Sequence, residues 1–225
     1  MRWVIHPGES PLFGDERGCA EFVQRLLRFD QASPERANPV QDEVLYVLAG
    51  RGTVTISGDE FALTPGAAAY VGRGTGWRVD EAEDLELMSV LVNDPVPAEA
   101  ATHSVVAGDE AEVEAATAGR MFRLLATPEV GCSTVTQFVG YIPVGRAPDH
   151  FHRYDEVIYV LEGEGALHVD GESAPLRPGT CVHLPSRLVH CLENSGPGEM
   201  QVLGVFRPAG SPAEAYYPDG TLAEY

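Results

Sequence analysis

Residues 145–163 read GRAPDHFHRYDEVIYVLEG, and the rest of the chain is organised around this stretch. His150 and His152 alternate, so on an extended strand both side chains leave the same face and both imidazoles can reach one point. Glu156 has the same parity, but at roughly 3.3 Å per residue an unbroken strand would carry it about 13 Å beyond His152. Because ligand atoms lie about 2 Å from a metal ion, we expect a turn at residues 153–155. Glu156 then opens a returning strand beside the histidines.

A second segment, residues 179–194 with the sequence GTCVHLPSRLVHCLEN, supplies one more histidine from a distant part of the chain. We expect His190 to reach the same point from another strand. Three imidazoles and one carboxylate form a donor set for a divalent transition metal. The sequence therefore predicts a metal site with the ligands His150, His152, Glu156 and His190.

The first half of the chain repeats the second at a constant offset of 113 positions, in one register over some sixty residues. The matched positions include Glu43-Val44 with Glu156-Val157, Tyr46-Val47-Leu48 with Tyr159-Val160-Leu161, and Pro65-Gly66 with Pro178-Gly179. Short runs of apolar and β-branched residues between Gly and Pro turns are typical of an all-β sandwich or barrel. We therefore predict two all-β domains, residues 1–95 and 120–225, joined by a linker of residues 96–119.

The repeat provides an internal control for the histidines. At the positions of the three histidines the first copy has Ala37, Pro39 and Trp77, while Glu43 matches Glu156. If the fold needed the histidines, the first copy would contain them. Their presence in the second copy alone indicates a functional site.

The two segments closely resemble the signature motifs of the cupin superfamily. The motifs are Gly145-x4-His150-x-His152-x3-Glu156-x6-Gly163 and Gly179-x5-Pro185-x-Arg187-x2-His190-x3-Asn194. The resemblance covers nearly the whole chain and implies a bicupin, with two jelly-roll barrels of the double-stranded β-helix type. It also implies that the C-terminal barrel holds a divalent metal through the four predicted ligands, and that the N-terminal barrel is degenerate. Arg187 departs from the motif, which usually has Gly there.

One metal per chain is therefore expected. Nitrogen and carboxylate ligands suit Fe(II), Mn(II), Ni(II), Cu(II) or Zn(II), and four of them leave up to two octahedral positions open. We favour iron or manganese.

Five further polar residues are weaker candidates for the pocket around the metal. Gln137 and Tyr141 share one face of a predicted strand and would contact substrate if that face is the inner one. Arg146 and Arg187 flank the motifs and could clamp a substrate carboxylate, or else pair with acidic neighbours at the surface. His183 is either a pocket residue or an ordinary hydrogen-bonded histidine of a strand.

Composition excludes several classes of function. The formal net charge of −19 repels nucleic acid and anionic membranes. The chain has no lysine, which excludes Schiff-base chemistry on an internal lysine and a P-loop. No secretion signal or run of 18 apolar residues is present, so a cytoplasmic protein is expected. Residues 208–225 are expected to pack along the outside, and association into a homo-oligomer is left open.

Three functions are compatible with these observations. The favoured one is a metal-dependent enzyme acting on a small organic molecule, as an Fe(II)-type dioxygenase. The second is a redox-neutral enzyme, such as the cupin isomerases, decarboxylases or ureidoglycine aminohydrolases. The third is a non-enzymatic metal-bearing protein that binds small molecules.

Overall fold

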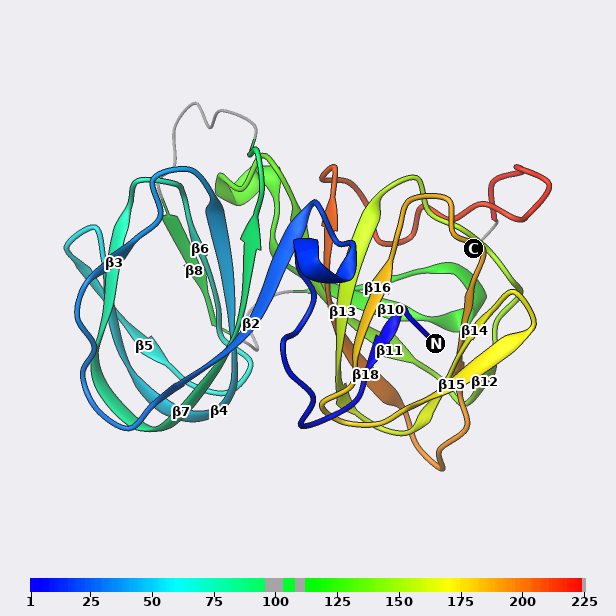
Figure 1. Cartoon of the computed structure of the whole chain (residues 1–225), viewed down its shortest axis with the longest axis horizontal. Helices are drawn as coiled ribbons and strands as arrows, with labels where there is room; N and C mark the ends of the chain where they lie inside the picture. Colours follow the sequence, from blue (N-terminus) through cyan, green and yellow to red (C-terminus); the bar gives the residue numbers. More distant parts are fainter. Residues whose placement is uncertain (96–102, 108–111, 224–225) are drawn as a thin grey trace. The chain divides into compact units, whose positions relative to one another are not determined.

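The computed structural model describes residues 1–95, 103–107 and 112–223 (Figure 1). These residues form β-strands and three short 3-10 helices, and no α-helix occurs among them. The predicted all-β class is confirmed. No helix in the described part of the chain is long and apolar enough to cross a membrane.

The chain divides into two compact units. The C-terminal unit comprises Met1–Leu12, Glu112–Leu124 and Gln137–Tyr225, and the N-terminal unit comprises Phe13–Ala111 and Leu125–Thr136. These limits differ from the predicted domains at two segments. Of the predicted linker, residues 96–102 and 108–111 lie outside the described residues, and the remainder contains two short strands.

In the N-terminal unit, one antiparallel sheet has the order β2-β7-β4-β6-β8, with β3 added to β7 and β5 to β4. The strands are β2 (Phe22–Phe29), β3 (Arg36–Ala37), β4 (Asp42–Ile56), β5 (Asp59–Leu63), β6 (Ala68–Val71), β7 (Gly76–Val92) and β8 (His103–Val106). The long strands β4 and β7 bend by register shifts. Gly50 permits one of these bends, since a Cβ there would lie 2.1 Å from the Asp84 carbonyl oxygen.

The C-terminal unit has two sheets, of order β1-β16-β13-β18-β11-β10-β9 and β12-β17-β14-β15. The strands are β1 (Val4–Ile5), β9 (Val113–Ala115), β10 (Met121–Ala126), β11 (Thr136–Ile142), β12 (Gly145–Arg146), β13 (Asp155–Glu162), β14 (Gly165–Val169), β15 (Glu172–Leu176), β16 (Cys181–Leu184), β17 (Cys191–Asn194) and β18 (Met200–Arg207). Alternate residues of both sheets, among them Ile158, Leu167 and Val202, form a common buried core. The strands enclose an interior, as Figure 1 shows.

Two segments belong to the unit that lies farther from them in sequence. Strand β1 adds to the C-terminal unit because Val4 pairs with Val182 of β16. Residues 125–136 are tied to the N-terminal unit through the buried carboxylate of Asp42, which accepts a hydrogen bond from Thr134 Oγ1 at 3.3 Å. Neither pairing has a local pattern that the sequence could show.

Candidate metal centre

The two predicted motif segments lie side by side in the C-terminal unit. His150 and His190 form an isolated antiparallel bridge, in which the His150 N–H donates to the His190 carbonyl at 3.0 Å and the reverse bond is 2.8 Å. The chain then turns after His152, and β13 begins at Asp155. Glu156 is thus the second residue of a returning strand, as the spacing predicted.

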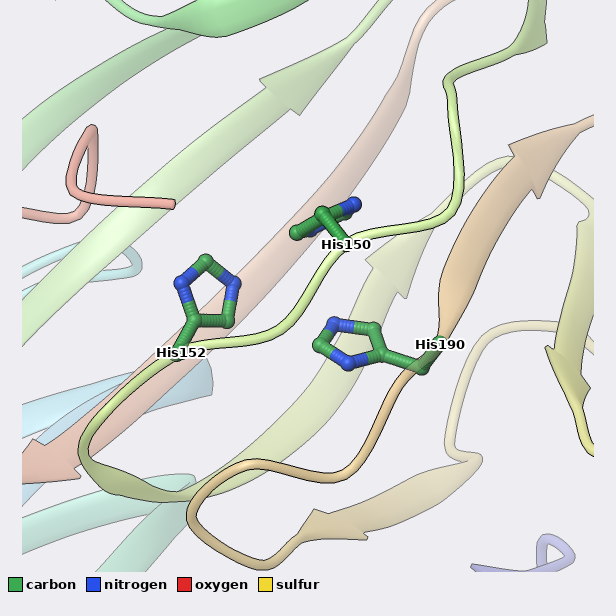
Figure 2. Close-up of side chains that lie close together, drawn as sticks. All are labelled: His150, His152 and His190. Carbon is green, nitrogen blue, oxygen red and sulfur yellow. The ribbon is translucent and has the colours of Figure 1, made fainter. Parts of the chain in front are cut away.

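The three histidine side chains converge on one point (Figure 2). One ring nitrogen from each of His150, His152 and His190 lies within 4.8 Å of the other two. The ring centroids are 4.6 Å apart for His150 and His190, 5.0 Å for His150 and His152, and 5.3 Å for His152 and His190. Such a cluster brings three nitrogen donors within reach of a single ion.

Backbone carbonyl oxygens fix the tautomer of all three rings. The Nδ1 contacts are Pro148 O for His150 at 3.0 Å, Glu214 O for His152 at 2.8 Å and Leu188 O for His190 at 2.9 Å. A carbonyl can only accept, so each Nδ1 carries the hydrogen and each Nε2 keeps its lone pair. Metal-binding histidines use the same arrangement, in which the second nitrogen is held by an outer partner.

Burial also keeps the rings uncharged. It lowers the pKa of His150, lowers that of His152 to about 3, and places that of His190 well below its ordinary value of 6.5. Each ring would lower its neighbours' pKa further if it were protonated. Because a metal binds neutral imidazole, the cluster at neutral pH is already in the binding protonation state.

Glu156 lies on the wall of the same cavity, 3% exposed. Glu156 is not part of the group of three histidines whose ligand atoms all lie within 4.8 Å of one another. Burial and the nearby charge of Asp155 raise the pKa of Glu156 to about 8, while the charge of Arg120 opposes this rise. Gly204 on β18 makes room for the Phe138 ring and for the carboxyl group, since a Cβ there would lie 2.2 Å from the ring and 2.9 Å from Glu156 Oε1.

The histidines and Glu156 open into a cavity. Its walls are largely apolar, with Phe122, Phe138, Ile158, Leu184, Leu192 and Val202 among them. Tyr154, in the turn before β13, is buried and stacks on His152 with ring centroids 4.6 Å apart and planes 9° apart. This stacking orients the imidazole, and the Tyr154 ring forms part of the cavity wall.

The C-terminal tail contributes to the cavity, so the expectation that it packs along the outside is wrong for its described part. Pro212, Ala215, Tyr217 and Ala223 line the cavity. The tail is held by two backbone hydrogen bonds between Phe151 and Tyr216, of 2.8 and 2.9 Å, and their rings stack at 5.6 Å. Through the Glu214 carbonyl the tail also fixes the ring of His152.

Arg120 lines the cavity as well, and no motif in the sequence pointed to it. Its Nη2 donates to the carbonyl oxygen of Leu192 at 2.7 Å. Loss of hydration lowers its pKa, against the opposing effects of Cys191 and Glu156.

A family model for the cupin domain matches residues 26–92 and residues 137–206. The chain belongs to the cupin family. Each match falls within one of the two units, so the protein is a bicupin.

Curated relatives match parts of the chain. A protein of Aquifex aeolicus is 30% identical over 76 residues, which are 33% of this chain and 61% of that protein. Quercetin 2,3-dioxygenase of Bacillus subtilis is 41% identical over 46 residues, 20% of this chain and 14% of that enzyme. The matches therefore span less than two thirds of these relatives' own lengths.

Solved structures match far more of the chain, at low identity. An iolb-like protein of Salmonella typhimurium has a TM-score of 0.77 with 14% identity, over 96% of this chain and 97% of that chain. Salicylate 1,2-dioxygenase of Pseudoaminobacter salicylatoxidans has a TM-score of 0.68 with 14% identity, over 83% and 71%. Oxalate decarboxylase of Bacillus subtilis, a protein with Mn(II) centres, has a TM-score of 0.63 with 15% identity, over 85% and 70%. These similarities show the cupin fold.

The N-terminal cupin barrel uses the corresponding positions differently. Trp77, at the position of His190, donates from Nε1 to Glu43 Oε2 at 3.1 Å. Arg25 pairs with Glu43 Oε1 at 2.7 Å, and the hydroxyl of Ser89 donates to the same oxygen. Glu43 is thus fully engaged by neighbouring side chains within its own barrel.

Of the weaker candidates, Tyr141 lines the cavity of the C-terminal cupin barrel, and the other four do not. Gln137 is buried on β11 and does not line the cavity, although Tyr141, on the same face of the strand, does. His183 contacts Asp155 Oδ1 through Nε2 at 2.8 Å. Arg146 is exposed and pairs with Asp149 at 3.1 Å.

Arg187 has a backbone role in the second cupin motif. Its φ of +67° lies in the left-handed region that glycine adopts most easily, which explains why the motif usually has Gly at this position. Its N–H donates to the His152 carbonyl at 2.7 Å, while its side chain is exposed. The contact ties the two motif segments together beside the histidine cluster.

Proposed function

We propose that the C-terminal cupin barrel binds one divalent transition metal through His150, His152, His190 and Glu156, and that the protein is an enzyme acting on a small organic molecule. The observation that supports this most directly is the convergence of three Nε2 lone pairs in a cavity, with every Nδ1 already bound to a carbonyl oxygen. A purely structural cluster of histidines would not need three equivalent free nitrogens facing one another.

The residues fit such an ion. Three neutral nitrogens and one carboxylate suit iron or manganese, and Glu156 becomes the fourth ligand when its carboxyl group loses its proton. When bound, the ion supplies Lewis acidity, and iron also supplies redox chemistry with O2. The protein positions the imidazoles through the carbonyls of Pro148, Glu214 and Leu188. Its apolar walls keep bulk water away from a bound substrate.

Within this class we favour a dioxygenase. The support is the sequence similarity to quercetin 2,3-dioxygenase and the shared fold with salicylate 1,2-dioxygenase. The alternative is a redox-neutral reaction, supported by the shared fold with oxalate decarboxylase. Since one fold hosts many reactions, the choice is made by experiment.

Oxygen uptake by the Fe(II)-loaded protein separates the two reactions. We expect O2 consumption with at least one of a set of catechols, thiols and β-diketones, and none with the His150→Ala variant. Anaerobic turnover of a keto or ureido acid, without O2 uptake on any compound of the set, would replace the dioxygenase with a redox-neutral enzyme. A protein that binds metal and turns over neither set would be a binding protein.

A further inference from the structure

Arg120 carries a positive charge into the cavity and has no acidic partner in the part of the chain that the structure describes. Among the described residues, no carboxylate lies within ion-pair distance of its guanidinium group, and its one hydrogen-bond acceptor is the Leu192 carbonyl oxygen. Guanidinium has five N–H donors, so most of them are left for another group. A partly buried cation without a counter-charge is costly, and a bound anion would offset that cost.

The charges around the cavity favour the same kind of ligand. Arg120 is close enough to act electrostatically on Glu156 and on all three histidines. The histidines are neutral, so a divalent ion, the Glu156 carboxylate and the Arg120 guanidinium together leave the cavity with a net positive charge. A neutral ligand would not compensate this charge, whereas a carboxylate would.

The rest of the wall is suited to an apolar body. Phe122 and Phe138 line the cavity with Ile158 and Val202. Phe138 is in edge contact with Phe206, with ring centroids 5.8 Å apart, so its ring has a fixed place. A ligand that matches both parts of the cavity has one anionic head and an apolar remainder.

We propose that Arg120 determines specificity by binding the carboxylate of a small organic acid, whose apolar part lies against the aromatic wall. The inference rests on the proposed function, since it assigns a substrate class to the same site. A planar guanidinium fork can bind a carboxylate through two parallel hydrogen bonds, which a single amide or hydroxyl cannot match.

The test is calorimetric binding of benzoate and benzamide to the Mn(II)-loaded protein. The two probes have the same ring and nearly the same size, and differ in charge. We expect benzoate to bind at least tenfold more tightly than benzamide. Arg120→Gln should weaken benzoate binding by about tenfold to a hundredfold and leave benzamide binding and metal content unchanged. Arg120→Lys keeps the charge but loses the planar guanidinium fork, so its affinity for benzoate should lie between those of the parent protein and Arg120→Gln.

Arg146→Gln is the matched control, because Arg146 is an exposed arginine of the same barrel that pairs with Asp149 and does not line the cavity. It should bind benzoate as the parent protein does. Equal affinity for benzoate and benzamide in the parent protein overturns the inference without any variant. Unchanged benzoate affinity in Arg120→Gln, or no binding of benzoate at millimolar concentrations, overturns it as well.

The outcomes also separate this inference from the enzymatic proposal. Carboxylate binding that depends on Arg120, in a protein that turns over no substrate, would remove the enzymatic proposal and leave the carboxylate site. Turnover of a neutral substrate at the same rate in the parent protein and in Arg120→Gln would support the enzymatic proposal and remove the carboxylate site.

Discussion

Deleting residues 211–225 tests whether the C-terminal tail is part of the metal centre. The deletion removes the Glu214 carbonyl, which accepts from His152 Nδ1 at 2.8 Å, together with the Tyr216 contacts that hold the tail to Phe151. His152 would keep its stacking contact with Tyr154 but lose the hydrogen bond that sets its tautomer. We expect a metal site that still forms and binds more weakly.

The size of the loss follows from that one hydrogen bond. Removing the outer partner of a metal-bound histidine typically weakens metal affinity about 10-fold to 100-fold, which corresponds to roughly 1.4–2.8 kcal/mol. The other two histidines keep their Pro148 and Leu188 carbonyls, so the deletion should not abolish binding. Faster release of the metal is expected too, because the tail lines the cavity.

Competition with a chromophoric chelator gives the metal affinity of the deletion variant and of the full chain. Glu214→Ala is the matched control, since it removes the side chain that accepts from the Tyr216 hydroxyl at 2.6 Å but leaves the backbone carbonyl in place. It should bind metal nearly as tightly as the parent. Circular dichroism and Tm establish that the shortened chain is folded. A folded deletion variant with the metal affinity of the full chain would refute the role assigned to the tail.

Three further predictions follow from the two barrels. Metal analysis should give one divalent ion per chain and His150→Ala should lose it, whereas two ions per chain would contradict a degenerate N-terminal barrel. In the metal-free protein, the pKa of Glu156 is raised from 4.5 to about 8, so its contribution to stability is complete below pH 4.5 and is lost as the pH rises through about 8. Glu156→Gln should therefore raise the Tm of the metal-free protein at alkaline pH and change it little near pH 5; an equal change at both would show that the shift is not the cause. Glu43→Ala removes the carboxylate that pairs with Arg25 and accepts from Trp77, and should lower the free energy of unfolding by about 2–3 kcal/mol in chemical denaturation with metal content unchanged. Loss of metal in Glu43→Ala would show that metal binding by the C-terminal barrel depends on the N-terminal barrel.

The sequence predicted the features that have a period or a repeat. Alternation placed His150 and His152 on one side, and the 13 Å gap to Glu156 required the turn that the structure shows before β13. The 113-residue repeat predicted two barrels. These features are local or internally duplicated, so a single sequence is enough to find them.

The remaining parts of the site depend on contacts without a local pattern. The tail reaches the cavity through two backbone hydrogen bonds to Phe151, which any pair of residues could form. Arg120 enters the cavity because β10 joins the larger sheet next to β11, and no spacing rule connects it with His150. Strand pairing between distant segments is set by packing of the whole unit. The places of the tail and of Arg120 in the cavity wall are therefore visible only in the structure.

The glutamate shared by the two barrels shows how the same strand position can serve the fold in one and a site in the other. Glu43 and Glu156 are similarly buried, at 5% and 3% exposure. Glu43 has the Arg25 cation, the Trp77 indole N–H and the Ser89 hydroxyl as partners, and these three groups stabilise its buried negative charge. Among the described residues, Glu156 has no ion pair, and its raised pKa reflects a carboxylate buried without sufficient compensation. Burial alone therefore does not distinguish them. A second positive charge beside Glu156 would compensate it as Arg25 compensates Glu43, and a divalent ion held by the three histidines would supply that charge.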